Sequence, residues 1–455
     1  MMTPRRLCQT LVSTLILCAT AFAGGPLYVG QGGSIDGKPY TWDPAAMPIK
    51  YTVDPGPMSS NAGKVVVDNA TGLQRVQQMF MNWQNVPTAA LSYSYAGQIL
   101  AAGGYVKGVD VASAFQFNAI VGSCNSALQN PIIFDSDGSL MTSLGVDSDV
   151  IGFTNICATS ASTGHITAAM ITLNGVWING STPMTKSEFS DAITHEMGHF
   201  AGLDHSQINV DVLQNGSCDL DTIAGMPLMF PFSVCPGRSD SGLPAIPTDD
   251  AAWISHFYPG PTYATTYGLI TGTIYFSDAA SAAQGVNVVV RAVDDPNTLQ
   301  DESRRVTFSA VSGLYFTSNP GQSISLGSDG KPDNANGSPY GSRQAALIGY
   351  YEIPVLPGTY TVQVESINSA FAQGSSVGPL DPPVRNPGQD EFWKNNESAY
   401  DIPLQRDTVT VTAGETVPNI NIILNGTQPT FDQYEDETQL FETLPPLALL
   451  RAEVC

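Results

Sequence analysis

Apolar positions along the chain show helical spacing in places in the first half and strand-like spacing in the second. Residues 64–83 carry apolar side chains at helical spacing, which predicts a long helix packed on a sheet. Thr185 and Glu188 form a capping box, which predicts the start of a second helix that continues through Met197. Alternating or β-branched runs predict strands at residues 48–53, 89–95, 115–121, 131–134, 150–156 and 166–173.

Beyond a linker expected at residues 259–265, helical periodicity disappears and short strands alternate with turns. The predicted strands are residues 269–276, 286–293, 350–353, 358–365, 408–411 and 419–424. Residues 294–345 and 369–400 are rich in Gly, Asp, Asn and Pro and are predicted to be long surface loops. Residues 428–455 are acidic and then apolar, which predicts a loosely ordered tail.

Length and composition indicate a globular protein of two or three domains, because 455 residues exceed one ordinary core. Apolar residues make up 42% of the chain and charged residues 13%, while 43 glycines and 32 prolines imply many turns. The net charge of −23 argues against nucleic acid and anionic membranes as partners, because both repel an acidic protein.

Residues 1–23 predict a signal peptide and therefore a secreted protein, extracellular or periplasmic. The segment has a basic start at Arg5 and Arg6, an apolar stretch at residues 7–20 and a small-x-small cleavage site at residues 21–23. A membrane anchor is the alternative, but the apolar run is short for a bilayer. A lipoprotein site at Cys18 is disfavoured by the bulky Leu17 before it.

Five cysteines remain after the leader, and an oxidising compartment predicts that they pair. The nearest pairs in sequence are Cys124 with Cys157 and Cys218 with Cys235, which leaves Cys455 over. The connectivity stays open at this stage. Zinc ligation is the alternative, although no C-x-x-C spacing supports it.

Three of the five histidines lie within one run, His-Glu-Met-Gly-His-Phe-Ala-Gly-Leu-Asp-His-Ser at residues 195–206. His195 and His199 are four residues apart and share one face of a helix, and the glycine at 202 permits a turn that returns His205 to the same ion. Three imidazoles with an open position are typical of catalytic zinc. Glu196 is then placed to accept a proton from a zinc-bound water. A structural zinc, or buried histidines with other partners, is the alternative.

This run resembles the signature of the metzincin metallopeptidases, H-E-x-x-H-x-x-G-x-x-H followed by a Met-turn, and Ser206 after it is similar to the matrixin branch. The resemblance implies an α+β catalytic domain at residues 24–260, with a twisted mixed sheet, long helices and one Zn²⁺. Pro-Leu-Met-Phe-Pro at residues 227–231 resembles the Met-turn. Met229 would then lie beneath the zinc ligands, with an ordinary core methionine as the alternative, and Phe230 would line the pocket for the residue after the cut bond.

The same resemblance implies that an edge strand near residues 151–157 binds the substrate backbone by strand addition, although an ordinary core strand is the alternative. Residues 248–258 are similar to the closing helix of the matrixin domain, where His256 would be structural. The segment between the third histidine and Met229 is longer than matrixins usually have, and Cys218 with Cys235 would tie it back.

Residues 266–425 resemble carboxypeptidase-regulatory-like, prealbumin-type folds, which implies an all-β sandwich domain at residues 261–427. Calcium is a second candidate ion. Its candidate sites are the acidic pairs Asp135 with Asp137 and Asp147 with Asp149, and the segment 329–333. A tight turn explains the first pair better, because the full calcium-loop pattern is absent.

The sequence therefore predicts a secreted zinc-dependent endopeptidase that hydrolyses peptide bonds of proteins or peptides by Glu196-assisted attack of a zinc-bound water. The alternative is a catalytically inactive secreted binding or adhesion protein that uses the β-sandwich. Neither reading involves nucleic acid or membrane insertion, and the oligomeric state stays open.

Overall fold

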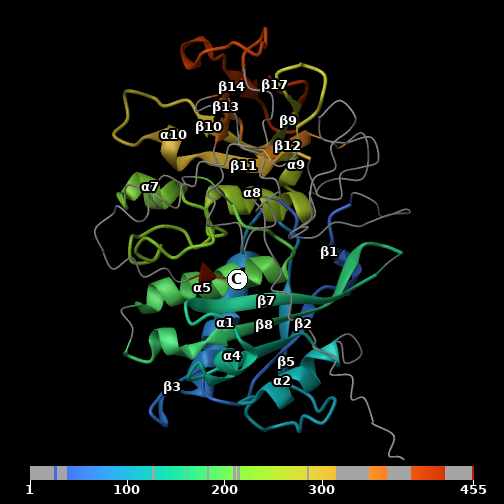
Figure 1. The fold of residues 1–455 in the computed structure, drawn as a ribbon, viewed down its shortest axis with the longest axis vertical. Coiled ribbons are helices and arrows are strands. Elements are labelled where there is room, and N and C mark those ends of the chain that lie inside the picture. Colours follow the sequence, from blue (N-terminus) through green and yellow to red (C-terminus); the bar gives the residue numbers. More distant parts are fainter. Residues whose placement is uncertain are drawn as a thin grey trace, which may run out of the picture.

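The computed structural model describes residues 25–27, 38–124, 129–160, 162–181, 184–206, 208, 212, 216–283, 286–313, 347, 349–365, 391–425 and 453–454. The expected signal peptide, Cys455, the calcium candidate at residues 329–333 and the expected tail apart from residues 453–454 lie outside these ranges. The described part is a mixed α/β structure with several sheets (Figure 1).

A seven-stranded mixed sheet lies at one end of the molecule and is built mainly from the first half of the chain. Its strands are β1 (Thr41–Trp42), β2 (Ile49–Val53), β5 (Tyr93–Gln98), β6 (Pro131–Asp135), β7 (Val150–Thr159), β8 (His165–Asn174) and β18 (Glu453–Val454). The order is β18-β7-β8-β6-β2-β5, with β1 beside β8. Strands β5, β2, β6 and β8 are parallel, whereas β7 runs antiparallel to β8.

Alternate residues of this sheet face two different helical layers. On β6, Ile132 belongs to the core beneath α1 (Asn69–Gln84) and α5 (Lys186–Phe200), and its neighbour Ile133 belongs to the cluster with α2 (Ala114–Val121) and α4 (Ser139–Leu144). Such alternation is what a strand covered on both faces requires. A hydrogen bond of 2.8 Å from Trp83 Nε1 to the carbonyl of Thr194 joins α1 to α5.

Several predicted elements of this half are confirmed, and three are wrong in part or in whole. The strand expected at residues 89–95 begins only at Tyr93 and runs to Gln98 as β5. The helix expected at residues 64–83 begins only at Asn69, because Lys64–Val67 forms strand β4 in a hairpin with β3 (Ser59–Asn61) and Asp68 caps the helix. Residues 115–121 are not a strand. They form helix α2, which Ser113 caps and which buries Phe117 and Ile120 at helical spacing.

The second half forms two sheets, which we call the C-terminal sheets. The five-stranded sheet has the order β11-β10-β13-β14 with β15 beside β13, and the four-stranded sheet the order β12-β9-β16 with β17 beside β9. Their strands are β9 (Gly268–Tyr275), β10 (Asn287–Ala292), β11 (Thr307–Val311), β12 (Tyr350–Val355), β13 (Gly358–Glu365), β14 (Glu391–Phe392), β15 (Val409–Val411), β16 (Thr416–Val417) and β17 (Ile422–Ile423).

The expectation of long surface loops is wrong for parts of residues 294–345 and 369–400. The first contains helix α10 (Glu302–Arg305) and the fully buried strand β11, and the second contains β14. Strand β11 is buried on both sides because it pairs with β10 and also lies against α8 (Thr248–Phe257). The expected linker at residues 259–265 includes the start of a short helix, α9 (Tyr263–Thr266).

The hydrophobic core continues from the first sheet into the C-terminal sheets. One cluster of buried side chains includes Phe80 of α1, Trp253 of α8 and Val290 of β10. Figure 1 shows α5 lying between the seven-stranded sheet and α8, with the C-terminal sheets beyond α8. Within the described ranges, no helix has the length and apolar character needed to cross a bilayer.

Candidate metal centre

Helix α5 presents the first two histidines on its buried face. The helix starts with the predicted capping box: Thr185 Oγ1 accepts from the Glu188 amide, and Glu188 Oε2 accepts from the Thr185 amide at 2.6 Å. Phe189, Ile193 and Met197 are fully buried and anchor the helix on the sheet. The last two turns of the helix, which carry His195 and His199, are therefore buried in the interior of the protein.

The three predicted ligands converge. The Nε2 atoms of His195, His199 and His205 lie 3.0 Å from one another in all three pairs. An ion bound tetrahedrally at roughly 2.0–2.1 Å would hold its nitrogens about 3.3 Å apart, so this spacing fits a metal such as zinc. Among the described residues, these side chains are the one set of three or more His, Cys, Asp or Glu found close enough together to hold a metal ion.

Backbone carbonyls orient two of the rings. Nδ1 of His195 lies 2.7 Å from the carbonyl of Leu228, and Nδ1 of His199 lies 2.9 Å from that of Leu203. A proton on Nδ1 donates to each carbonyl and leaves the Nε2 lone pair for a metal. Burial lowers the pKa of His195 well below its ordinary value and the pKa of His199 to about 4, which favours the neutral, ligating form.

The turn after α5 depends on Gly202. Its φ of +94° lies in the left-handed region, and a Cβ there would lie 2.7 Å from the carbonyl oxygen of Tyr40. The reversed chain brings His205, which is 1% exposed, back to the helix. The role predicted for this glycine from the sequence therefore matches the backbone geometry.

Glu196 lies beside the histidines and is fully buried. Its Oε2 accepts a hydrogen bond of 2.6 Å from Thr154 Oγ1 on β7. The helix approaches β7 closely at Gly152, where a Cβ would lie 3.0 Å from Glu196 Cγ. Thr154 was not identified from the sequence, because nothing local marks a strand threonine as the partner of a helix carboxylate.

Met229 lies against α5 at Gly198, between the two histidines of the helix. A Cβ on Gly198 would be 2.3 Å from Met229 Sδ, so the glycine lets the thioether approach the helix backbone between the two ligands. Asp250 of α8 holds this turn, because its carboxylate accepts from the amides of Leu228 at 2.7 Å and Met229 at 3.0 Å. Burial raises the pKa of Asp250 to about 6.

A pocket opens beside His195. Phe230 is among its lining residues, as are Met226, Leu228 and Phe232, and the polar side chains there include Arg238. Arg238 donates to the carbonyls of Ile223 and Pro244 at 2.7 and 2.8 Å and so fixes the pocket wall. Apolar side chains and charged ones, among them Glu188 and Asp191, share the pocket lining.

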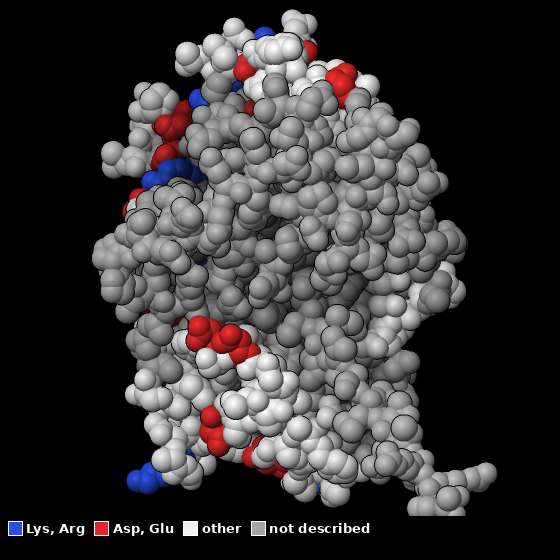
Figure 2. Space-filling view, viewed as in Figure 1, with Lys and Arg blue, Asp and Glu red and all other residues white. Residues whose placement is uncertain are grey.

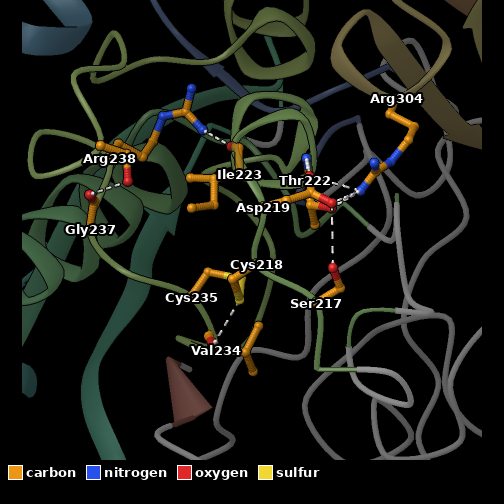
Figure 3. The surroundings of a disulfide bond; sticks show 11 residues. Ser217, Cys218, Asp219, Thr222, Ile223, Val234, Cys235, Gly237, Arg238 and Arg304 are labelled. Atoms are coloured by element: carbon orange, nitrogen blue, oxygen red, sulfur yellow. Dashed lines mark hydrogen bonds and ion pairs between the residues drawn. A yellow bond between two sulfur atoms is a disulfide. The ribbon is translucent and has the colours of Figure 1, made fainter. Parts of the chain in front are cut away.

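Both predicted disulfides are present, Cys124–Cys157 and Cys218–Cys235. The second closes the segment after His205, and Cys235 lines the pocket. Figure 3 shows this disulfide beside α7 (Leu220–Gly225), with Arg304 reaching Asp219 at the start of the helix. Two disulfides fit an oxidising, extracellular compartment.

The acidic pairs considered for calcium have local roles. Asp135 accepts from the amides of Leu140 and Met141, and Asp137 accepts from that of Ser139, so the tight-turn interpretation is confirmed. His256 lies away from the metal centre, 2.7 Å from Tyr263 Oη and 3.1 Å from Glu352.

Figure 2 shows some of the acidic side chains of the protein on one face. Much of this face is formed by residues that are not described. Acidic and basic side chains lie next to one another at the edge near α7 and α10. Two ion pairs join these helices, Arg304 with Asp219 at 2.9 Å and Arg305 with Asp221 at 2.8 Å.

No protein-family model and no curated protein matches this sequence. Among solved structures, a leucine-rich repeat protein from Bacteroides thetaiotaomicron aligns with 36% of this chain at 13% identity and a TM-score of 0.15. The chain covers 14% of that protein's length. The functional argument therefore depends on the geometry of the site.

Proposed function

We propose that this protein is an exported zinc-dependent endopeptidase of the metzincin type, close to the matrixin branch. The observation that carries the proposal is the convergence of His195, His199 and His205 with Glu196 on the same helix and a pocket beside His195. The unbroken H-E-x-x-H-x-x-G-x-x-H spacing and Met229 packed against α5 at Gly198 support it.

The residues divide the chemistry of peptide hydrolysis between them. The three Nε2 atoms would hold the ion, and a bound zinc would polarise the scissile carbonyl and lower the pKa of a water molecule. Glu196 accepts a proton from the water molecule while the oxygen of the water bonds to the carbonyl carbon of the substrate. Glu196 then gives this proton to the amine nitrogen as the C–N bond breaks. Thr154 holds the carboxylate in place.

Substrate positions follow from the surroundings of Glu196. Strand β7 lies next to Glu196, and among the described strands only the two-residue β18 lies outside it, paired in parallel with Val150 and Gly152. A peptide substrate is proposed to take the place of β18 there. The side chain after the cut bond would enter the pocket lined by Phe230 and Leu228, which favours an apolar residue there.

The test is peptide cleavage by the purified full chain with and without a chelator, read by mass spectrometry of a peptide library. We expect cleavage that needs zinc. The variant Glu196→Ala should keep stoichiometric metal and lose at least a thousandfold in kcat, because it lacks the proton acceptor.

The matched control is Glu415→Ala, an exposed glutamate of the C-terminal sheets that lies outside the pocket lining. It should cleave normally after allowance for stability. Metal binding without any cleavage by the wild-type chain would instead support the binding or adhesion protein.

A further inference from the structure

Ser309 of β11 lies deep in the C-terminal sheets and yet contacts the region that carries the histidines. It is 0% exposed, and its Oγ lies 3.0 Å from Oγ of Ser206, the residue after the third histidine. The two serines lie 103 residues apart in the sequence. Their contact directly links the C-terminal sheets to the ligand segment.

The backbone of Ser309 is held by helix α8 at the same point. Its amide donates to Asp249 Oδ1 at 3.0 Å, and its carbonyl accepts from Trp253 Nε1 at 2.8 Å. Strand β11 is the outer strand of the five-stranded sheet, and an edge strand leaves alternate backbone groups without strand partners. Side chains of α8 satisfy these groups at Ser309.

Next to this point, hydrogen bonds lead to one of the histidines, His195, and to Ser206, the residue after His205. Asp250, next to Asp249, holds the amides of Leu228 and Met229. The carbonyl of Leu228 accepts from His195 Nδ1 at 2.7 Å, and the carbonyl of Met229 accepts from the amide of Ser206 at 2.9 Å. Movement of β11 would therefore disturb both the ring of His195 and the segment of His205.

A second set of contacts holds the pocket wall. Helix α10, directly before β11, forms the two ion pairs with α7, and Thr307 Oγ1 donates to the carbonyl of Gly225 at 3.2 Å. A Cβ on Gly225 would lie 1.6 Å from the carbonyl oxygen of Arg304, so the two segments touch through their backbones. The wall is thus fastened to the same strand.

We propose that β11 is a positioning element of the metal centre, with Ser309 as the positioning residue that acts through Ser206 and α8. The C-terminal sheets then complete the metal site and are not a separable targeting module. This inference depends on the histidine triad as a metal site and not on peptidase activity. Loss of a partner behind metal ligands typically weakens metal binding 10–100-fold, and we expect about tenfold for the more distant Ser309.

The experiment compares Ser309→Ala with Ser312→Ala in the full chain. Ser312 is equally buried, but its Oγ bonds only within the C-terminal region, donating to the carbonyl of Ala283 and accepting from the amide of Val286. Zinc dissociation constants from competition with a chromophoric chelator, and the visible spectrum of the Co²⁺-loaded protein, are the two measurements.

We expect S309A to bind zinc about tenfold more weakly and to shift the Co²⁺ bands, while S312A loses only stability. Ser206→Ala should reproduce the effect, and the S206A/S309A double variant should be no weaker than either single variant. If S309A does not fold, S206A removes the same hydrogen bond from the other side. Metal binding of wild-type strength in S309A or in S206A would overturn the proposal, whatever the peptidase assay shows.

Discussion

The hydroxyl group of Thr154 orients the carboxylate of Glu196 through one hydrogen bond. Its 2.6 Å hydrogen bond comes from β7, while Glu196 itself is on α5. A carboxylate with only its own side-chain torsions to hold it would sample other rotamers in the site. On the proposed function, the bond would serve proton transfer by orienting the carboxylate.

Replacing Thr154 by Val keeps the shape of the side chain and removes the hydroxyl. We expect kcat to fall about tenfold with KM and bound zinc unchanged, because a hydrogen bond to a charged group is worth about 1.5–3 kcal/mol and only part of it is expressed in the reaction. Steady-state kinetics on a fluorogenic peptide provides the measurement. Thr154→Ser, which restores the hydroxyl, should recover most of kcat; a T154V enzyme with wild-type kcat would show that Glu196 needs no such support.

At the residue scale, the sequence was enough to identify the candidate ligands but not the groups that support them. His195, His199 and His205 lie in one short run, and their spacing in the sequence predicts that they come together. Thr154 and Ser309 contact their partners only after strands and helices pack, so no spacing in the sequence marks them. Met229 is an intermediate case, because the prolines near it on both sides marked it in the sequence as a candidate Met-turn residue, whereas its contact with α5 is seen only in the fold.

Among the elements, the segment between Cys218 and Cys235 has the most direct effect on the pocket. The disulfide closes it at one end, Arg238 bonds to its carbonyls, and helix α7 within it is clamped by α10. A wall held at three points keeps a fixed pocket shape. Loss of one of these supports should change how substrate fits before it changes the metal site.

The variant with Cys218 and Cys235 both replaced by Ser tests this element. A closed loop of this length contributes about 3 kcal/mol of stability, and its removal should also raise KM several-fold for peptides with a large apolar residue after the cut bond. Zinc content and kcat should stay as in the wild type. The control replaces Cys124 and Cys157, which lie outside the pocket lining. Because Cys157 belongs to β7, any change in KM should be the same for peptides with a small and with a large residue after the cut bond. Equal KM in both variants would contradict a role of the loop in substrate fit.

Element prediction succeeded where a local signal was recognised, and failed where a cap was overlooked or where tertiary contacts decided. The capping box at Thr185 predicted the start of α5 correctly. Residues 115–121 are apolar enough for a strand, but the cap at Ser113 makes them a helix. Strand β11 was hidden in a segment rich in loop-forming residues, because its burial comes from α8 and not from its own pattern.

Over the whole molecule, the excess of acidic groups makes folding sensitive to pH. The net charge is −23, and several carboxyls are buried. Glu391 on β14 is 2% exposed, and burial, with Glu397 nearby, raises its pKa to about 8. Burial also raises the pKa of Glu397, to about 7. Both groups favour the protonated form in the folded protein.

The sign of the pH dependence follows from these shifts. Between the unfolded pKa of about 4.3 and the folded value of about 8, the folded state holds a proton at Glu391 that the unfolded state has released, so stability falls as pH rises through this range. Glu391→Gln should therefore raise the midpoint of thermal unfolding by several degrees at pH 8.5 and leave it nearly unchanged at pH 5.

The control is Glu415→Gln, which removes the same charge from an exposed site of the same region whose pKa is lowered by Thr412. It should not stabilise the protein at pH 8.5. Calorimetry at both pH values measures the difference. A stabilisation of equal size in the two variants would attribute the effect to net charge and not to the buried group.

If β11 positions the metal centre, the contact between Ser206 and Ser309 also bears on when the site forms during folding. A chain is made from its N-terminus, so the three histidines leave the ribosome well before the strand that steadies them. On the proposal made here, a half-made or half-exported chain carries the ligands without their finished arrangement. A hydrolase built this way gains its activity as one of its last folding events, when the nascent chain and its export machinery are no longer within reach.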